Sequence, residues 1–191
     1  MEKKKIVFLF SGQSRNSPFS LNEKKRSLEI LNCYNKYIFT EEFKSKYNYK
    51  VFISADDIDL SYTINYFSKE NIGNIHLLDT DYYYENTCSK VKDVSFYLNI
   101  YNKKDFGNFR KYDNSIYQHH KILDCYNMIR NYKDFNNIDY IVRLRFDITI
   151  NSDVSSLINK LETDLNLQIT LGHDTFAIGR PNIMDCYCTG L

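Results

Sequence analysis

Residues 139–150 constrain the fold of this chain more than any other stretch, because they alternate like a buried β-strand and yet end in charges. One predicted face is wholly apolar or aromatic and the other becomes charged along its length: Tyr140, Val142, Leu144 and Phe146 against Ile141, Arg143, Arg145 and Asp147. Charged groups at the end of a buried strand are costly unless an anion or a metal ion meets them. Ligands bind at the carboxyl ends of strands in α/β sheets. The sequence therefore predicts an active site centred on Arg143, Arg145 and Asp147.

Three apolar runs before this strand predict further strands, at residues 6–10, 50–54 and 75–78. A helix is predicted over residues 21–38, capped by Ser20 or Asn22, and a second one from Asp56 or Asp57 to about Glu70. A turn is expected at residues 71–74. This β-α-β-α-β order implies an α/β fold with a doubly wound, mostly parallel sheet flanked by helices.

The second half of the chain mixes helical and extended patterns. Residues 82–113 lack a clear period, whereas Ile116, Leu123, Tyr126 and Ile129 predict a helix over 114–132 with these residues facing the core. Further helices are predicted at 154–161 and 181–187 and a strand at 167–171, with no element assigned to 172–179.

Length and composition restrict the protein class. The 191 residues suit a single domain, 1–191, and the abrupt end is consistent with a piece of a longer polypeptide. A net charge of +1 gives no electrostatic case for nucleic acid or membrane binding. The apolar run near the start is too short for a signal peptide or a membrane span, which favours a cytoplasmic protein. Five cysteines without a Cys-x-x-Cys pair predict free thiols rather than a zinc site.

Polar groups follow each predicted strand, and in a parallel sheet these ends converge on one edge. They are Ser11, Gly12 and Arg15 after the first strand, Asp56 and Asp57 after the second, Asp79 and Asp81 after the third, Arg145 and Asp147, and His173 and Asp174 after the late strand. Two plainer interpretations compete: each acid caps the following helix, or the arginines and Asp147 form an ion-pair network. His119 or His120 is a weaker candidate because adjacent helical residues face different ways.

The chemistry of these groups fits a nucleotide-sugar site. Arginine suits two-pronged contact with phosphate, and a nearby carboxylate suits a divalent cation on a diphosphate. No Gly-x-Gly-x-x-Gly or Gly-x-x-x-x-Gly-Lys motif follows the first strand, which argues against dinucleotide-binding and P-loop enzymes.

Three segments in order resemble the glycosyltransferases of large DNA viruses, including the chlorella-virus type, and of bacterial polysaccharide biosynthesis. They are residues 6–15 (an apolar strand, then Ser-Gly-Gln-x-Arg), 140–148 (Tyr-Ile-Val-Arg-Leu-Arg-Phe-Asp-Ile) and 174–187 (Asp-x-Phe-Ala-Ile-Gly-x-x-x-Ile-Met-Asp-x-Tyr). The resemblance implies a GT-A fold and a metal-assisted enzyme of the hexosyltransferase type. We expect a UDP-sugar donor, a glycan hydroxyl as acceptor, Mn²⁺ or Mg²⁺ as cofactor, and the host cytoplasm as location if the protein is viral.

The resemblance also implies roles for individual residues. Ser11, Gly12, Gln13 and Arg15 would border the nucleotide, and Asp56 and Asp57 would lie near its base or ribose. Asp147 would hold the metal, with Arg145 in place of the first acid of the family's Asp-x-Asp motif, and Asp79 with Asp81 is the competing metal site. Asp174 would accept a proton from the acceptor hydroxyl, with Asp185 as a weaker candidate. The alternatives are a non-catalytic nucleotide- or glycan-binding domain and a nucleotidyltransferase.

Overall fold

The structure is a computed structural model that describes residues 2–12, 21–56, 65–78, 110–146, 148–164, 167, 169–172 and 175–189; the side chains of residues 21–28, 56, 110–117 and 170–172 are outside this description. Its elements are β1 (Lys4–Gly12), α1 (Leu21–Tyr37), α2 (Glu41–Lys46), β2 (Tyr47–Asp56), η1 (Lys69–Asn71), β3 (Ile72–Leu78), α6 (Arg110–Arg130), η3 (Phe135–Asn137), β4 (Tyr140–Arg145), α7 (Val154–Thr163), β5 (Ile169–Gly172), β6 (Phe176–Gly179) and α8 (Pro181–Thr189). None of the helices in these ranges is long and apolar enough to cross a membrane.

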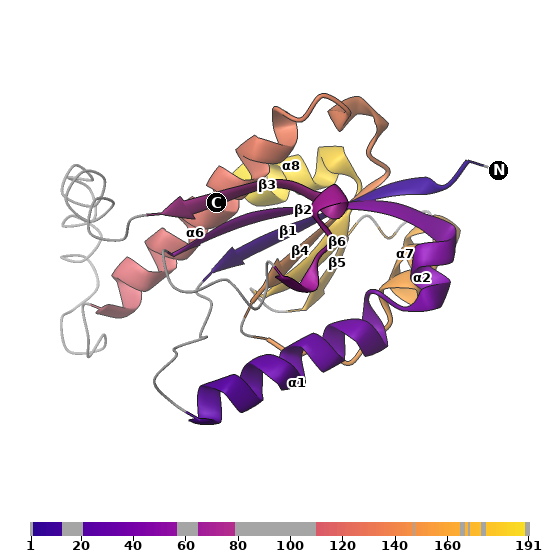
Figure 1. Ribbon diagram of the computed structural model, residues 1–191. Helices are drawn as coiled ribbons and strands as arrows, with labels where there is room; N and C mark the ends of the chain where they lie inside the picture. Colours follow the sequence, from indigo (N-terminus) through magenta and orange to yellow (C-terminus); the bar gives the residue numbers. More distant parts are fainter. Residues whose placement is uncertain are drawn as a thin grey trace.

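A six-stranded sheet forms the middle of the molecule, with the strand order β3-β2-β1-β4-β6-β5 (Figure 1). β1 pairs in parallel with both β2 and β4, and β2 pairs in parallel with β3. β6 runs antiparallel to its two neighbours, β4 and β5. The predicted α/β fold with a doubly wound, mostly parallel sheet is confirmed.

Helices cover both faces of the sheet, α1, α2 and α7 on one side and α6 and α8 on the other (Figure 1). The α1 side is rich in aromatic contacts: the Phe10 ring lies 5.6 Å from the Tyr34 ring of α1 and 5.3 Å from the Phe146 ring that follows β4. The α6 side has a smaller apolar core, which includes Leu9, Ile141 and Met184. Apolar burial on both faces explains why β1 reads as a continuous apolar run.

The predicted alternation of β4 is also confirmed. Tyr140, Val142, Leu144 and Phe146 all belong to the core on the α1 side. Ile141 belongs to the core on the α6 side, so Arg143 and Arg145, two and four residues later, extend along that face. The two faces of one strand therefore separate apolar packing from the charged groups.

The predicted inner face of α6 is partly wrong. Leu123 is 39% exposed, whereas Ile122, Cys125, Tyr126 and Ile129 are buried. These four recur at helical spacing and include a cysteine and a tyrosine, which pack as well as leucine here. Contact with β1 and β2 sets the rotation of the helix, and the sequence does not show that contact.

Two strands differ from the sequence prediction. β6 was not predicted, since its four residues, Phe-Ala-Ile-Gly, are too few to show a period. β3 begins at Ile72 where a turn was expected. The register with β2 shifts there, so that Gly73 lies between the residues paired with Val51 and Phe52. The glycine marks a strand irregularity and not a chain reversal. The predicted helix after Asp57 and the irregular 82–113 region lie mostly outside the described residues.

Three further local features follow from the residue types. Asp153 caps α7, accepting a hydrogen bond from the Ser156 amide at 2.7 Å. Pro181 opens α8. The four described cysteines, Cys33, Cys125, Cys186 and Cys188, are free thiols. Burial raises the pKa of the Cys188 thiol to about 12, so this residue packs as an apolar group.

Gly73→Ala is expected to destabilise the protein by about 1–3 kcal/mol, because the new methyl group would lie 2.5 Å from Cζ of Phe52. The Phe52 ring is 1% exposed and packs on Tyr132 at 5.5 Å, so it has little room to move. Urea denaturation measures the change. The same substitution in a Phe52→Leu background should cost clearly less, and equal costs in both backgrounds would show that the ring is not the obstacle.

Candidate active site

The sheet order places a topological switch point between β1 and β4. The chain leaves β1 through α1 on one face and reaches β2, whereas it enters β4 from α6 on the opposite face. Ligands in open α/β sheets bind outside the carboxyl ends of the strands where the order reverses in this way. The residues at this point are Ser11 and Arg145, which are register partners, and Gly12.

Four polar residues form a row across four adjacent strands at this edge. Ser54 is the register partner of both His76 and Ser11, and Ser11 is the partner of Arg145. We call His76, Ser54, Ser11 and Arg145 the polar row. All four face α6, since Ser54 and His76 contact Asp124 of that helix and Arg145 contacts Gln118. The strand spacing makes the row about 14 Å long from first to last Cα.

Arg145 is held from three directions. Its amide donates to the carbonyl of Thr175 at 3.2 Å, and its carbonyl accepts from the Tyr34 hydroxyl at 3.2 Å. Its Nη1 donates to Oε1 of Gln118 at 3.3 Å. The side chain is only partly buried, and an amide oxygen orients a guanidinium without supplying an opposite charge. The backbone of Arg145 is thus fixed, and its partly buried guanidinium lies at the carboxyl edge of the sheet.

Gly12 ends β1 with a φ of 129°, in the region that side chains disfavour. A Cβ there would lie 3.8 Å from Cγ of Arg145, which is an ordinary contact distance. The glycine is therefore needed for its backbone conformation and not for space.

Arg143 lies below this edge. It is 0% exposed, with Leu9 and Ala177 as its register partners on the neighbouring strands. Its charge lowers the pKa of Cys188, although burial outweighs that effect. In this position Arg143 acts within the core between the sheet and α8, and contact with a substrate stays a prediction.

Asp124 was not singled out from the sequence, and it organises the far end of the polar row. Its Oδ2 accepts from the Ser54 hydroxyl at 2.7 Å. Its two oxygens lie 2.9 and 2.8 Å from Nδ1 of His76. Burial lowers the pKa of His120, one turn earlier on α6, and this residue also interacts electrostatically with Asp124 and His76. The i, i+4 spacing of His120 and Asp124 was visible in the sequence, but the contacts of Asp124 with β2 and β3 were not.

The structure brings together only part of the predicted site. Ser11, Gly12 and Arg145 converge at the switch point, and Asp56 ends β2 with its side chain outside the description. The other predicted groups lie outside the described residues: Gln13, Arg15, Asp57, Asp79, Asp81, Asp147, His173 and Asp174. Asp185, the weaker candidate base, lies on α8 with an oxygen 3.9 Å from Nη1 of Arg130, which fits a structural role.

A metal site also stays a prediction. Within the described ranges, no group of three or more His, Cys, Asp or Glu side chains is placed to hold an ion. The carboxylates predicted to bind Mn²⁺ or Mg²⁺, those of Asp147 or of Asp79 and Asp81, are outside those ranges.

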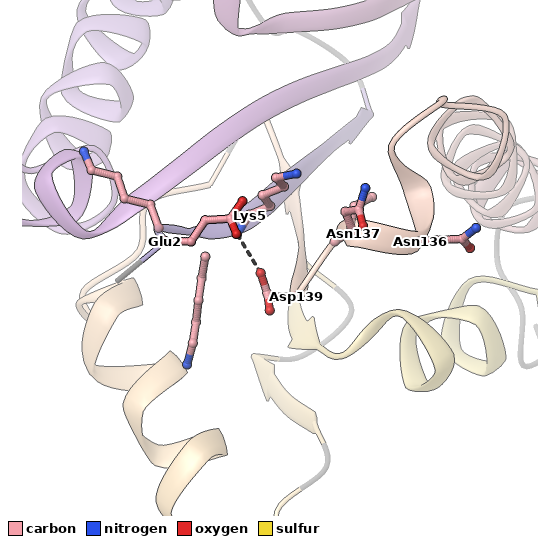
Figure 2. A pocket seen from close by; sticks show the side chains of 8 residues that line it. Glu2, Lys5, Asn136, Asn137 and Asp139 are labelled. Atoms are coloured by element: carbon pink, nitrogen blue, oxygen red, sulfur yellow. Dashed lines mark hydrogen bonds between the residues drawn. The ribbon is translucent and has the colours of Figure 1, made fainter.

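A polar pocket of about 340 Å³ lies at the amino edge of the sheet, away from the switch point (Figure 2). Lys3, Lys4, Lys5 and Asp139 line part of it. Protein contacts occupy several of their polar groups: the backbone amide of Lys5 donates to Asp139 at 2.7 Å, Lys3 donates to a backbone carbonyl at 3.0 Å, and Lys4 pairs with Glu162. These contacts tie β1 to its neighbours, and we assign the pocket no ligand.

Comparison with known proteins gives little. No protein-family model and no curated protein matches the sequence. The fold is similar to a cytidylyltransferase from Leptospira borgpetersenii serovar Hardjo-bovis (strain JB197), with 13% identity and a TM-score of 0.43 over 96% of this chain and 63% of that one. It is also similar to the mannosyltransferase Ktr4p from S. cerevisiae in complex with GDP, with 14% identity and a TM-score of 0.40 over 84% of this chain and 39% of that one. Such values say nothing of activity, and the chain spans only part of either protein.

Ser11 and Ser54 offer a matched pair of substitutions, because both are 0% exposed register partners on one face. Ser54→Ala should destabilise the protein by about 1 kcal/mol or more, since Asp124 loses a hydrogen bond. Ser11→Ala should be nearly neutral, because the Ser11 hydroxyl has no hydrogen-bond partner among the described residues. Urea denaturation of both variants provides the comparison, and similar losses would contradict it.

Proposed function

We propose that this protein is a GT-A-type glycosyltransferase that binds a nucleoside diphosphate sugar, with a UDP-sugar as the expected donor, and transfers the sugar to a glycan hydroxyl. The observation that supports this most is the position of Arg145, beside Ser11 and Gly12 at the switch point of a mostly parallel sheet. The sugar, the acceptor and the metal are expectations from the sequence.

The proposed reaction needs a positive group at the leaving diphosphate. As the bond between the sugar and the diphosphate breaks, its electron pair passes to a phosphate oxygen, and the negative charge there increases. A guanidinium that is already oriented stabilises this charge without reorganisation. The hydrogen bond from Nη1 to Gln118 orients the guanidinium, and the bond from the Arg145 amide to the Thr175 carbonyl fixes the backbone that carries it.

The remaining roles are assigned to two aspartates. One is close to Arg145 in the sequence, and the other is adjacent to a residue that hydrogen-bonds to Arg145. Asp147 lies two residues after Arg145, and Asp174 directly precedes Thr175, whose carbonyl bonds to the Arg145 amide. We propose that Asp147 holds Mn²⁺ or Mg²⁺, which would supply further positive charge to the diphosphate. Asp174 would take the proton of the acceptor hydroxyl as that oxygen bonds to the sugar.

Arg145→Gln should raise the Kd for UDP at least about tenfold, because charge-assisted hydrogen bonds to phosphate are lost. Isothermal titration calorimetry measures this, with GDP, CDP and ADP as parallel ligands. Arg130→Gln is the matched control, since it removes the same charge from an arginine on α6 that lies 3.9 Å from an oxygen of Asp185. An unchanged Kd in the Arg145 variant, or equal changes of Kd in both variants, would show that the diphosphate does not bind at Arg145.

The metal assignment has its own test. UDP should raise the melting temperature more in the presence of Mn²⁺ than in its absence, by mass action. Asp147→Asn should abolish this Mn²⁺-dependent increment and sugar transfer, while Asp81→Asn leaves both intact. The reverse result would transfer the metal site to Asp79 and Asp81. Release of UDP from a UDP-sugar supports glycosyl transfer, whereas release of pyrophosphate from UTP and a sugar phosphate would support a nucleotidyltransferase.

A further inference from the structure

Diphosphate binding at Arg145 gives no role to the polar side chains at the other end of the polar row. At that end His76 meets Asp124, and Asp124 also accepts from Ser54. Two residues earlier on β1 and β2, the packing against α6 is apolar, through Leu9 and Phe52. A hydrogen-bonded histidine at the open edge of a sheet therefore calls for an explanation beyond packing.

The contacts of Asp124 determine how His76 presents its ring. A carboxylate can only accept hydrogen bonds, so the Nδ1 atom of His76 carries the hydrogen in this contact. In the neutral ring, Nε2 then has a lone pair that points away from Asp124. The Ser54 hydroxyl holds the carboxylate at 2.7 Å, so the orientation of the imidazole is fixed from beneath.

Exposure decides which of these groups can meet a ligand. Ser54 is 0% exposed, and the side chain of Asp124 is 20% exposed. The side chain of His76 is 52% exposed. Of the three side chains, that of His76 is thus the most accessible to a ligand.

The length of the row relates His76 to the proposed diphosphate position. Arg145 and His76 are three strands apart, about 14 Å between Cα atoms. An extended nucleoside diphosphate has a comparable length, with the diphosphate at one end and the base at the other. If the diphosphate lies at Arg145 and the nucleoside extends over β1 and β2, its base reaches the carboxyl end of β3.

We propose that His76 is a specificity-determining residue that accepts a hydrogen bond, through Nε2, from an N–H group of the nucleobase, with Asp124 and Ser54 as positioning residues. This inference rests on the proposed function, since it needs the diphosphate at Arg145. The rival explanation is that the three side chains only fasten α6 to β2 and β3.

His76→Asn separates the two explanations. The asparagine amide keeps a donor where Nδ1 was, so it can still bond to Asp124, but nothing replaces Nε2. Calorimetry compares UDP, GDP, CDP, ADP and inorganic pyrophosphate on the full chain. We expect the wild type to prefer one nucleotide. In the variant the Kd for that nucleotide should rise about threefold to tenfold, with the Kd for pyrophosphate and the melting temperature unchanged.

Several results would overturn the inference while leaving the diphosphate site in place. One is a wild-type protein that binds the four nucleotides with equal Kd. Another is an equal rise of all four Kd values in His76→Asn, which would mean that His76 contacts the ribose. A third is a lower melting temperature of His76→Asn with unchanged Kd values. His76→Gln, which restores a polar group near Nε2, should bind the preferred nucleotide better than His76→Asn, and equal Kd values would count against Nε2. Failure of pyrophosphate and every nucleotide to bind would instead refute the proposed function and this inference with it.

Discussion

The parallel pairing of β1 with both β2 and β4 is the interaction on which the rest of the structure depends. It places β1 between helices on both faces, so its side chains can be apolar throughout the strand's middle. It also aligns the carboxyl ends of strands that are more than a hundred residues apart in the chain, which makes Ser11 and Arg145 neighbours. The switch point follows from this pairing and from nothing local.

The two faces of the sheet differ in packing and in buried charge. On the α1 side, Phe8, Phe10, Phe39 and Phe43 pack ring against ring within the larger apolar core. On the α6 side the core is thinner and includes the buried charges of Arg143 and Lys121. Buried charges are expensive to keep, so proteins hold them chiefly where the charge has a use. The asymmetry separates the aromatic core on the α1 side from the buried charges on the α6 side.

Sequence reasoning succeeded where one strand or helix carried its own pattern. The alternation of β4 identified both its apolar face and the direction of Arg143 and Arg145, because period-2 patterning needs no partner. It failed for Leu123, since helix rotation depends on what the helix packs against. It also missed His76 and Asp124, which lie on β3 and α6 and become a pair only through the register of β2 with β3.

The sequence by itself determined most of the longer strands and helices, the mostly parallel α/β class and the apolar and charged faces of β4, because these depend on local periodicity and capping. It did not predict the short elements α2 and β6. Only the tertiary structure decided that Arg143 is buried while Arg145 lies partly exposed at the carboxyl edge of the sheet, and that Ser54, His76 and Asp124 meet. The physical reason is that burial and side-chain contact depend on strand register and helix rotation, which are set by the packing of distant segments and have no local signature.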